Sequence, residues 1–105
     1  MKMLLIVFRD SLEDEILVLL KELDVKAFTE LQKVGGTGET GAAFHSFASP
    51  GVNTMIMTAL AEDQADRVVE GLKAFRDQLA KQQQGAKIPL RVFVLPCLQV
   101  VYSYG

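Results

Sequence analysis

Residues Gly36 to Gly41 form the string Gly-Thr-Gly-Glu-Thr-Gly, which has the GxGxxG spacing of phosphate-binding loops. In a dinucleotide-binding fold such glycines lie between a strand and a helix, so that the helix N-terminus meets the pyrophosphate. No helical pattern follows here, because a Pro50-Gly51 break is followed by an apolar, strand-like run from Thr54. The string is therefore predicted to lie in a loop between two strands. There the glycines either form flexible turns or bind an anion through backbone N–H groups.

Lys87 and Arg91 are candidate ligands for a phosphate or carboxylate group. They flank Pro89 at the expected entry to a late strand. Positive side chains at such a point can hold an anion, and surface charges that are solvated or paired are the alternative interpretation.

The single histidine and the single cysteine are candidate metal ligands. His45, Cys97 and the carboxylate of Glu39 would supply N, S and O donors suited to a transition metal. These residues lack the close spacing of known metal motifs, and a cysteine after a buried strand is more often a small apolar residue packed in place.

Composition restricts the partners and the compartment. The chain of 105 residues has a net charge of −2 and is predicted to form a single domain over 1–105 that does not bind nucleic acid. One cysteine suits a reducing compartment, so we expect a cytoplasmic protein. The apolar start, Met1 to Phe8, is too short to span a membrane and is expected to be a strand.

The hydrophobic periodicity predicts the order βαββαβ. Strands are expected over 1–8, 25–34, 54–60 and 90–95, with helices from an N-cap at Ser11 to Asp24 and over 62–83. Right-handed crossovers place both helices on one face of a four-stranded antiparallel sheet, which is the α+β ferredoxin-like arrangement. The first and last strands are apolar on both faces, so we expect self-association to cover the second face.

Several segments resemble the PII signalling family in this order along the chain. They are Met1-Lys2, Lys26-Ala27-Phe28-Thr29-Glu30, the glycines Gly35 and Gly41 around the loop, and Arg91-Val92-Phe93-Val94-Leu95-Pro96 with Gln99-Val100-Val101. The resemblance implies a ferredoxin-like homotrimer. It also implies that residues 35–51 form a flexible loop, like the family's T-loop, that touches a partner protein such as a transporter, enzyme or regulator.

The resemblance also implies a ligand site in the clefts between subunits. Its residues would be Thr29, Gly35, Thr37, Gly38, Glu39, Lys87 and Arg91, with Glu39 placed to help hold the Mg²⁺ of an adenine nucleotide. The chain departs from the family where Ile88-Pro89-Leu90-Arg91 replaces a Gly-Asp-Gly-Lys segment, and Tyr102-Ser103-Tyr104 replaces basic residues near the end.

Two functional hypotheses follow. The first is a trimeric PII-like regulatory protein that binds an adenine nucleotide or another anion between subunits and signals through residues 35–51. The alternative is a sensor of divalent or transition metals, similar to the CutA-like tolerance proteins, that uses His45 with Glu39 or Cys97. No Ser/His/Asp or Cys/His spacing indicates a nucleophile, so we expect no enzymatic activity.

Overall fold

The structure is a computed structural model, and it describes residues 1–35 and 52–101. Along the chain these form strand β1 (Lys2–Arg9), a 3₁₀ helix (Asp10–Leu12), helix α1 (Glu13–Glu22), strands β2 (Thr29–Val34) and β3 (Asn53–Leu60), helix α3 (Glu62–Gln82) and strand β4 (Leu90–Pro96). Neither α1 nor α3 combines the length and the apolar character that a membrane span requires.

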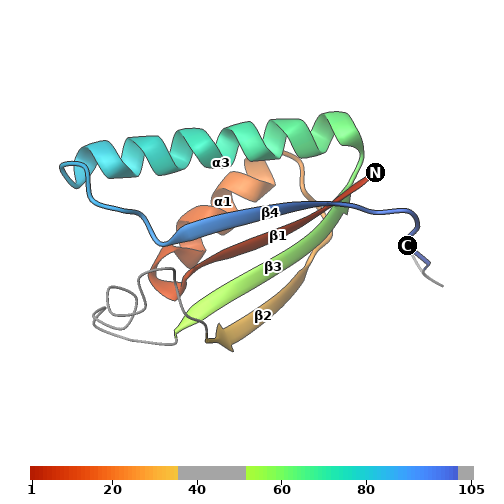
Figure 1. Ribbon diagram of the computed structural model, residues 1–105, viewed down its shortest axis with the longest axis horizontal. Helices are drawn as coiled ribbons and strands as arrows, with labels where there is room; N and C mark the ends of the chain where they lie inside the picture. Colours follow the sequence, from red (N-terminus) through yellow and green to blue (C-terminus); the bar gives the residue numbers. More distant parts are fainter. Residues whose placement is uncertain (36–51, 102–105) are drawn as a thin grey trace.

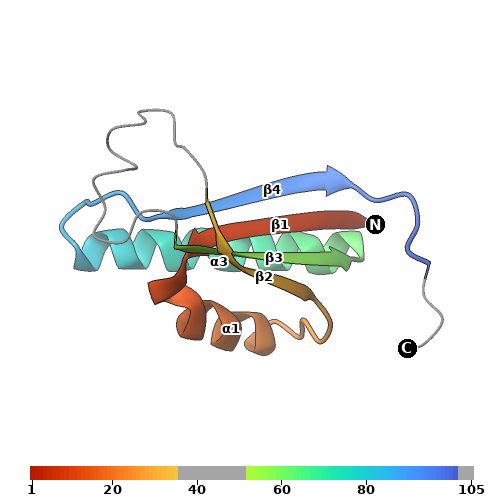
Figure 2. The same ribbon diagram turned by 90° about the horizontal axis from the view of Figure 1, so that it is seen from below.

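The strands form one antiparallel sheet in the order β2-β3-β1-β4. Strand β1 lies in the centre and pairs with β3 on one side and β4 on the other. Both helices pack on the same side of the sheet (Figures 1 and 2). The predicted ferredoxin-like fold is therefore confirmed, and β2, the least apolar strand, lies at an edge as its composition predicts.

The hydrophobic core lies between the sheet and the two helices. In β1 the side chains of Leu4, Ile6 and Phe8 are buried, while the intervening residues are only partly covered. From the helices the core receives apolar side chains that recur at three- and four-residue spacing, namely Ile16 and Leu20 of α1 and Ala65, Val68 and Leu72 of α3.

The start of α1 differs from the predicted N-cap at Ser11. The helix begins at Glu13, after a 3₁₀ turn, and no side chain of the described residues caps it. Leu12 takes the N-cap position because its side chain is buried, at 8% exposure, in the core. Three acidic residues in the first turn, Glu13 to Glu15, favour the positive end of the helix without a cap.

The second strand is shorter than the predicted range 25–34. Asp24 has a φ of 64°, and the N–H of Val25 donates to the Leu20 carbonyl at 2.9 Å, which closes the end of α1. Val25 is buried in the core. Pairing with β3 begins only at Thr29, so residues 25–28 complete the helix end and the connection rather than the strand.

The end of α3 follows the predicted pattern. Gly85 has a φ of 82°, in the left-handed region, and its N–H donates to the carbonyl of Ala80 at 2.7 Å. This bond satisfies a carbonyl in the last turn of the helix. The preceding Gln84 also has a positive φ, of 58°.

Burial within α1 predicts a contrast between two substitutions. Ile16→Ala should lower the free energy of unfolding by about 2–5 kcal/mol, because it removes a fully buried side chain from the core. Val18→Ala should change it by no more than about 0.5 kcal/mol, since Val18 is 57% exposed on the same helix. Urea unfolding at equal protein concentration measures both, and equal losses would contradict the described packing.

Candidate functional site

Four chain segments meet at one end of the sheet. In the strand register Arg9, at the end of β1, lies opposite Asn53, at the start of β3, and Asn53 lies opposite Val34, at the end of β2. Strand β4 also starts at this end, because Leu90 pairs with Phe8 (Figure 1). We call this region the loop end of the sheet, since Gly35 and residue 52, which border residues 36–51, adjoin it.

The side of the sheet away from the helices carries mainly apolar side chains. We call it the open face, and its residues are Thr29 and Leu31 of β2, Met55, Met57 and Ala59 of β3, Met3, Leu5 and Val7 of β1, and Arg91, Phe93 and Leu95 of β4. Within the described chain no helix covers this face. Leu31, Phe93 and Leu95 are accordingly 40%, 46% and 44% exposed.

Arg91 is the charged residue that β4 contributes to the open face. It lies opposite Val7 in the register and is exposed, close to the loop end. Among residues 1–35 and 52–101, no acidic side chain forms an ion pair with it, whereas Arg67 pairs with Asp63 and Arg76 with Asp77 on α3. The guanidinium of Arg91 is thus exposed to solvent.

The segment before β4 uses its backbone to hold the sheet together. The carbonyl of Pro89 accepts the N–H of Arg9 at 3.1 Å, and the N–H of Leu90 donates to the Ile88 carbonyl at 2.8 Å. Ile88 itself packs against the core. The segment therefore offers no glycine cradle for phosphate, and the exposed Lys87 is its remaining basic group.

Thr29 does not meet Arg91 within one chain. The two residues lie on opposite edge strands of the sheet, β2 and β4. Three strand spacings separate these edges, which corresponds to about 14 Å. One small ligand can contact both residues only if they come from different copies of the chain.

Arg9 is a second arginine at the loop end, and it was not among the predicted ligand residues. It follows Met3, Leu5 and Val7 in the alternation of β1 and therefore belongs to the open face. The expected first strand ended at Phe8, so Arg9 was placed outside it. Extending the period-two pattern by one residue would have put Arg9 on this face.

The candidate metal ligands are not brought together in the described chain. Cys97 lies at the end of the sheet opposite the loop end, where its N–H donates to the Met1 carbonyl at 3.1 Å. Its thiol is partly exposed, and Sγ lies 3.7 Å from the carbonyl of Gln99. Residues 1–35 and 52–101 hold no group of three potential metal ligands. Four predicted ligand residues, Thr37, Gly38, Glu39 and His45, lie outside the described residues, so the metal site remains a prediction.

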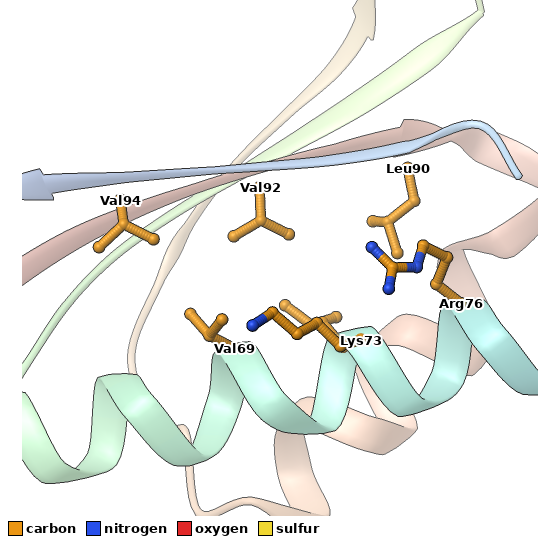
Figure 3. Close-up of a pocket in the computed structure, with 7 residues that line it drawn as sticks. Val69, Lys73, Arg76, Leu90, Val92 and Val94 are labelled. Carbon is orange, nitrogen blue, oxygen red and sulfur yellow. The ribbon is translucent and has the colours of Figure 1, made fainter.

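A hollow of about 170 Å³ lies between α3 and β4. Val92 and Val94 point into it from β4, and the aliphatic part of Lys73 and the guanidinium of Arg76 lie over it from α3 (Figure 3). Both cations already have partners on the helix, because Lys73 pairs with Glu70 at 3.0 Å and Arg76 with Asp77 at 2.9 Å. Its wall is apolar and its charges are compensated, so we do not assign a ligand to it.

Two carboxyl groups face each other between α1 and β2. Glu13 accepts a hydrogen bond from the side-chain amide of Gln32 at 3.1 Å. The pKa of Glu30 is raised above its ordinary value, first by a hydrogen bond with the carboxyl group of Glu13, then by partial burial and by the negative charge of Glu13. Two carboxyl groups share a hydrogen bond only while one of them holds a proton, so the raised pKa of Glu30 means that this pair favours its protonated form.

The family model for nitrogen regulatory protein P-II matches residues 1–103. No curated protein matches the chain.

Solved structures share the fold. One is CPII from Thiomonas intermedia K12 bound to ADP, AMP and acetate, with a TM-score of 0.66 and 23% identity over 90% of this chain and 82% of that chain. A second CPII structure, bound to ADP, AMP and bicarbonate, has a TM-score of 0.66 and 22% identity over 90% and 88%. A protein from Thermus thermophilus, described as PII-like and signaling, has a TM-score of 0.55 and 20% identity over 89% and 81%.

The Glu13–Glu30 contact predicts a pH dependence of stability. A raised pKa in the folded state means that the folded protein binds more protons than the unfolded chain, so stability falls as pH rises above the ordinary value of 4.5. Glu30→Gln mimics the protonated acid, so its free energy of unfolding should not fall in this way as pH rises. The variant should therefore be more stable than the wild type at pH 7, and the difference in free energy of unfolding should be smaller at pH 4.5. Urea unfolding at the two pH values measures the difference, and Glu15→Gln on the exposed side of α1 is the control.

Proposed function

The chain belongs to the nitrogen regulatory protein P-II family, and from this premise we propose that it forms a trimer with a small anionic effector bound between subunits. The effector is an adenine nucleotide or another small anion. Residues 35–51 communicate the bound state to a partner protein. The observation that carries the proposal is the open face, which is apolar over most of its area and carries Arg91 near the loop end, without an ion-pair partner among residues 1–35 and 52–101.

The open face supports the assembly. Leu5 and Phe93 lie in one register row with Met57, and this row ends at Thr29 on the β2 edge, while Leu31 lies in the neighbouring row opposite Met55. A contiguous apolar face of this kind is uncommon on a soluble monomer and is usually covered by another chain. Copies of the same chain arranged around a symmetry axis would bury it and hide the aliphatic and aromatic side chains from water.

The positions of Arg91 and Thr29 support an effector site between subunits. They lie on opposite edges of the sheet, and edges of neighbouring copies meet in a closed ring. An anion held by Arg91 of one copy would then lie within reach of Thr29 of the next. The ligands in the CPII structures, ADP, AMP, acetate and bicarbonate, are all anions and indicate the chemical class.

The arrangement of the loop end supports a link between effector and loop. Gly35 and residue 52 border residues 36–51 and adjoin the same end of the sheet as Arg91. An anion bound there lies beside the points at which the loop leaves and re-enters the sheet. Such a ligand changes the loop only by binding its conformations with different affinities.

The assembly predicts a specific response to a charged substitution on the open face. Wild-type protein should elute with a mass about three times the chain mass of 11.6 kDa. Phe93→Glu should reduce this mass to that of a monomer, because a carboxylate would be buried in the apolar interface. Light scattering coupled to size exclusion measures the mass. Val18→Glu, on the exposed side of α1, should leave the trimer intact, and a monomeric wild type at micromolar concentration would contradict the proposal.

The effector site predicts ligand-dependent stabilisation. A ligand that binds only the folded state at about 100 times its Kd adds about 2.7 kcal/mol, which raises the melting temperature by roughly 10–20 °C. We expect such a shift with at least one of ATP, ADP, AMP, cyclic AMP or bicarbonate. Arg91→Ala should abolish it, while Arg67→Ala, whose side chain pairs with Asp63 on α3, should retain it.

Divalent metals are tested as further ligands in the same melting experiment. A shift with a transition metal that is lost in His45→Ala, together with no shift from any nucleotide or bicarbonate, would contradict the effector proposal and favour the metal-sensing alternative. Conversion of a bound nucleotide to product would show an enzymatic function instead.

A further inference from the structure

Three sulfur-bearing side chains gather at the end of the sheet opposite the loop end. The N–H of Cys97 donates to the carbonyl of Met1 at 3.1 Å, so these two residues extend the antiparallel pairing of β1 with β4 by one pair. Met3 follows on β1, opposite Leu95. The start of β1 and the end of β4 accordingly lie side by side in both views (Figures 1 and 2).

The three sulfur residues share one face of the sheet. Met3 and Leu95 belong to the open face, and side chains alternate along a strand, so Met1 and Cys97 fall on the open face as well. Residues directly opposite each other have Cβ atoms about 4.5–5.5 Å apart, and diagonal neighbours such as Met3 and Cys97 are about 7–8 Å apart. Because methionine has three rotatable bonds, two thioethers and one thiol at these positions can converge on a single ion.

The surroundings leave this cluster open to a ligand. Met1 is 52% exposed, and Met3 and Cys97 are partly exposed. On the other side of Met3 the register places Ala59 of β3, whose small side chain adds little bulk beside the methionine. Sγ of Cys97 lies 3.7 Å from the carbonyl of Gln99, and a thiol is a weak donor, so metal coordination can replace this contact.

The donor set selects a soft metal. Histidine, cysteine, aspartate and glutamate form no group of three among residues 1–35 and 52–101, but thioether sulfur is a further donor, and thioethers with a thiolate suit Cu(I). On binding, Cu⁺ forms a bond to Sγ of Cys97 while the thiol proton leaves to solvent, and no electron is transferred. The thiolate and the monovalent ion form a neutral unit. An apolar face tolerates such a unit better than the net charge that a divalent ion would leave.

We propose that Met1, Met3 and Cys97 form a soft-metal site that binds one Cu(I) ion per chain. This inference goes beyond the proposed function. Arg91 lies opposite Val7, and Val7 is four residues along β1 from Met3, which corresponds to about 13 Å. The copper site and the effector site therefore occupy different ends of the open face, and either can fail without the other.

Competition with a chromophoric chelator tests the site. Cu(I) is presented to the full chain as its bicinchoninate complex, without oxygen and with a reductant, and the loss of the complex's colour measures the copper transferred. The wild type should take up one Cu(I) per chain. Met3→Leu and Cys97→Ser should each weaken the affinity at least about tenfold, because even residues that only orient a metal ligand cost about 10–100-fold when they are changed. Met1→Leu, produced from a cleavable fusion, should have the same effect.

Met55→Leu is the matched control. It changes the same residue type on the same face, but Met55 lies opposite Val7, near the loop end, so this variant should keep the wild-type affinity. Mg²⁺ should not compete for the site, because it prefers oxygen ligands. X-ray absorption at the copper edge should show sulfur neighbours, and fewer of them in Met3→Leu. A methionine that only packs in an interface would not change this spectrum.

Three results would overturn the site. The first is no transfer of Cu(I) to the wild type. The second is weakened binding in Cys97→Ser with wild-type affinity in Met3→Leu and Met1→Leu, which would reduce the site to an isolated thiol. The third is binding that is lost in His45→Ala and unchanged in Met3→Leu, which would move the metal to the histidine.

The effector site is judged separately, by the melting shifts with nucleotides and bicarbonate in wild type and Arg91→Ala. Circular dichroism and light scattering check the fold and mass of each copper-site variant. Met3→Leu nearly conserves the volume and apolar character of the side chain, so it should fold. If it does not, Met3→Ile takes its place, and wild-type affinity in that variant would exclude Met3 as a ligand.

Discussion

Strand β1 carries apolar side chains on both of its faces, and the need to cover both is the constraint on which the rest of the molecule depends. Its backbone is satisfied on both sides, because β3 and β4 flank it in the sheet. Its apolar side chains are buried on one face only. Leu4, Ile6 and Phe8 lie in the core under the helices, whereas Met3, Leu5 and Val7 lie on the open face. The apolar face towards the helices is therefore buried within the chain, and the proposed assembly would bury the open face. In such a protein the stability of the fold depends on the concentration of the subunits.

The antiparallel register determines where chemistry can occur on this scaffold. It gathers the end of β1, the end of β2, the start of β3 and the start of β4 at one end of the sheet. The charged residues of the open face lie at that end, and its centre is apolar. In the proposed assembly, contact between subunits and contact with a ligand would therefore use adjoining parts of one surface.

The helices and strands could be predicted because their hydrophobic patterns repeat along the chain. Features that depend on contacts between distant segments could not be predicted from the sequence. The long second helix was predicted over 62–83 because its apolar spacing persists over about four turns, and it ends one residue earlier, at Gln82. Ser11 and residues 25–28 were misassigned because burial of neighbouring side chains, which local sequence does not show, overrode capping and strand propensity. Arg91 was predicted as a ligand residue from its place at a strand entry, and that role stays a prediction. Its proximity to Arg9 depends on the register between the first and last strands, which only the folded chain reveals.

The hydrogen bond from the Arg9 N–H to the Pro89 carbonyl helps to align β1 with β4. Main-chain atoms alone form it, so the alignment of β1 with β4 does not require an arginine side chain at position 9. A substitution at position 9 by any residue other than proline therefore keeps the main-chain bond that aligns β1 with β4.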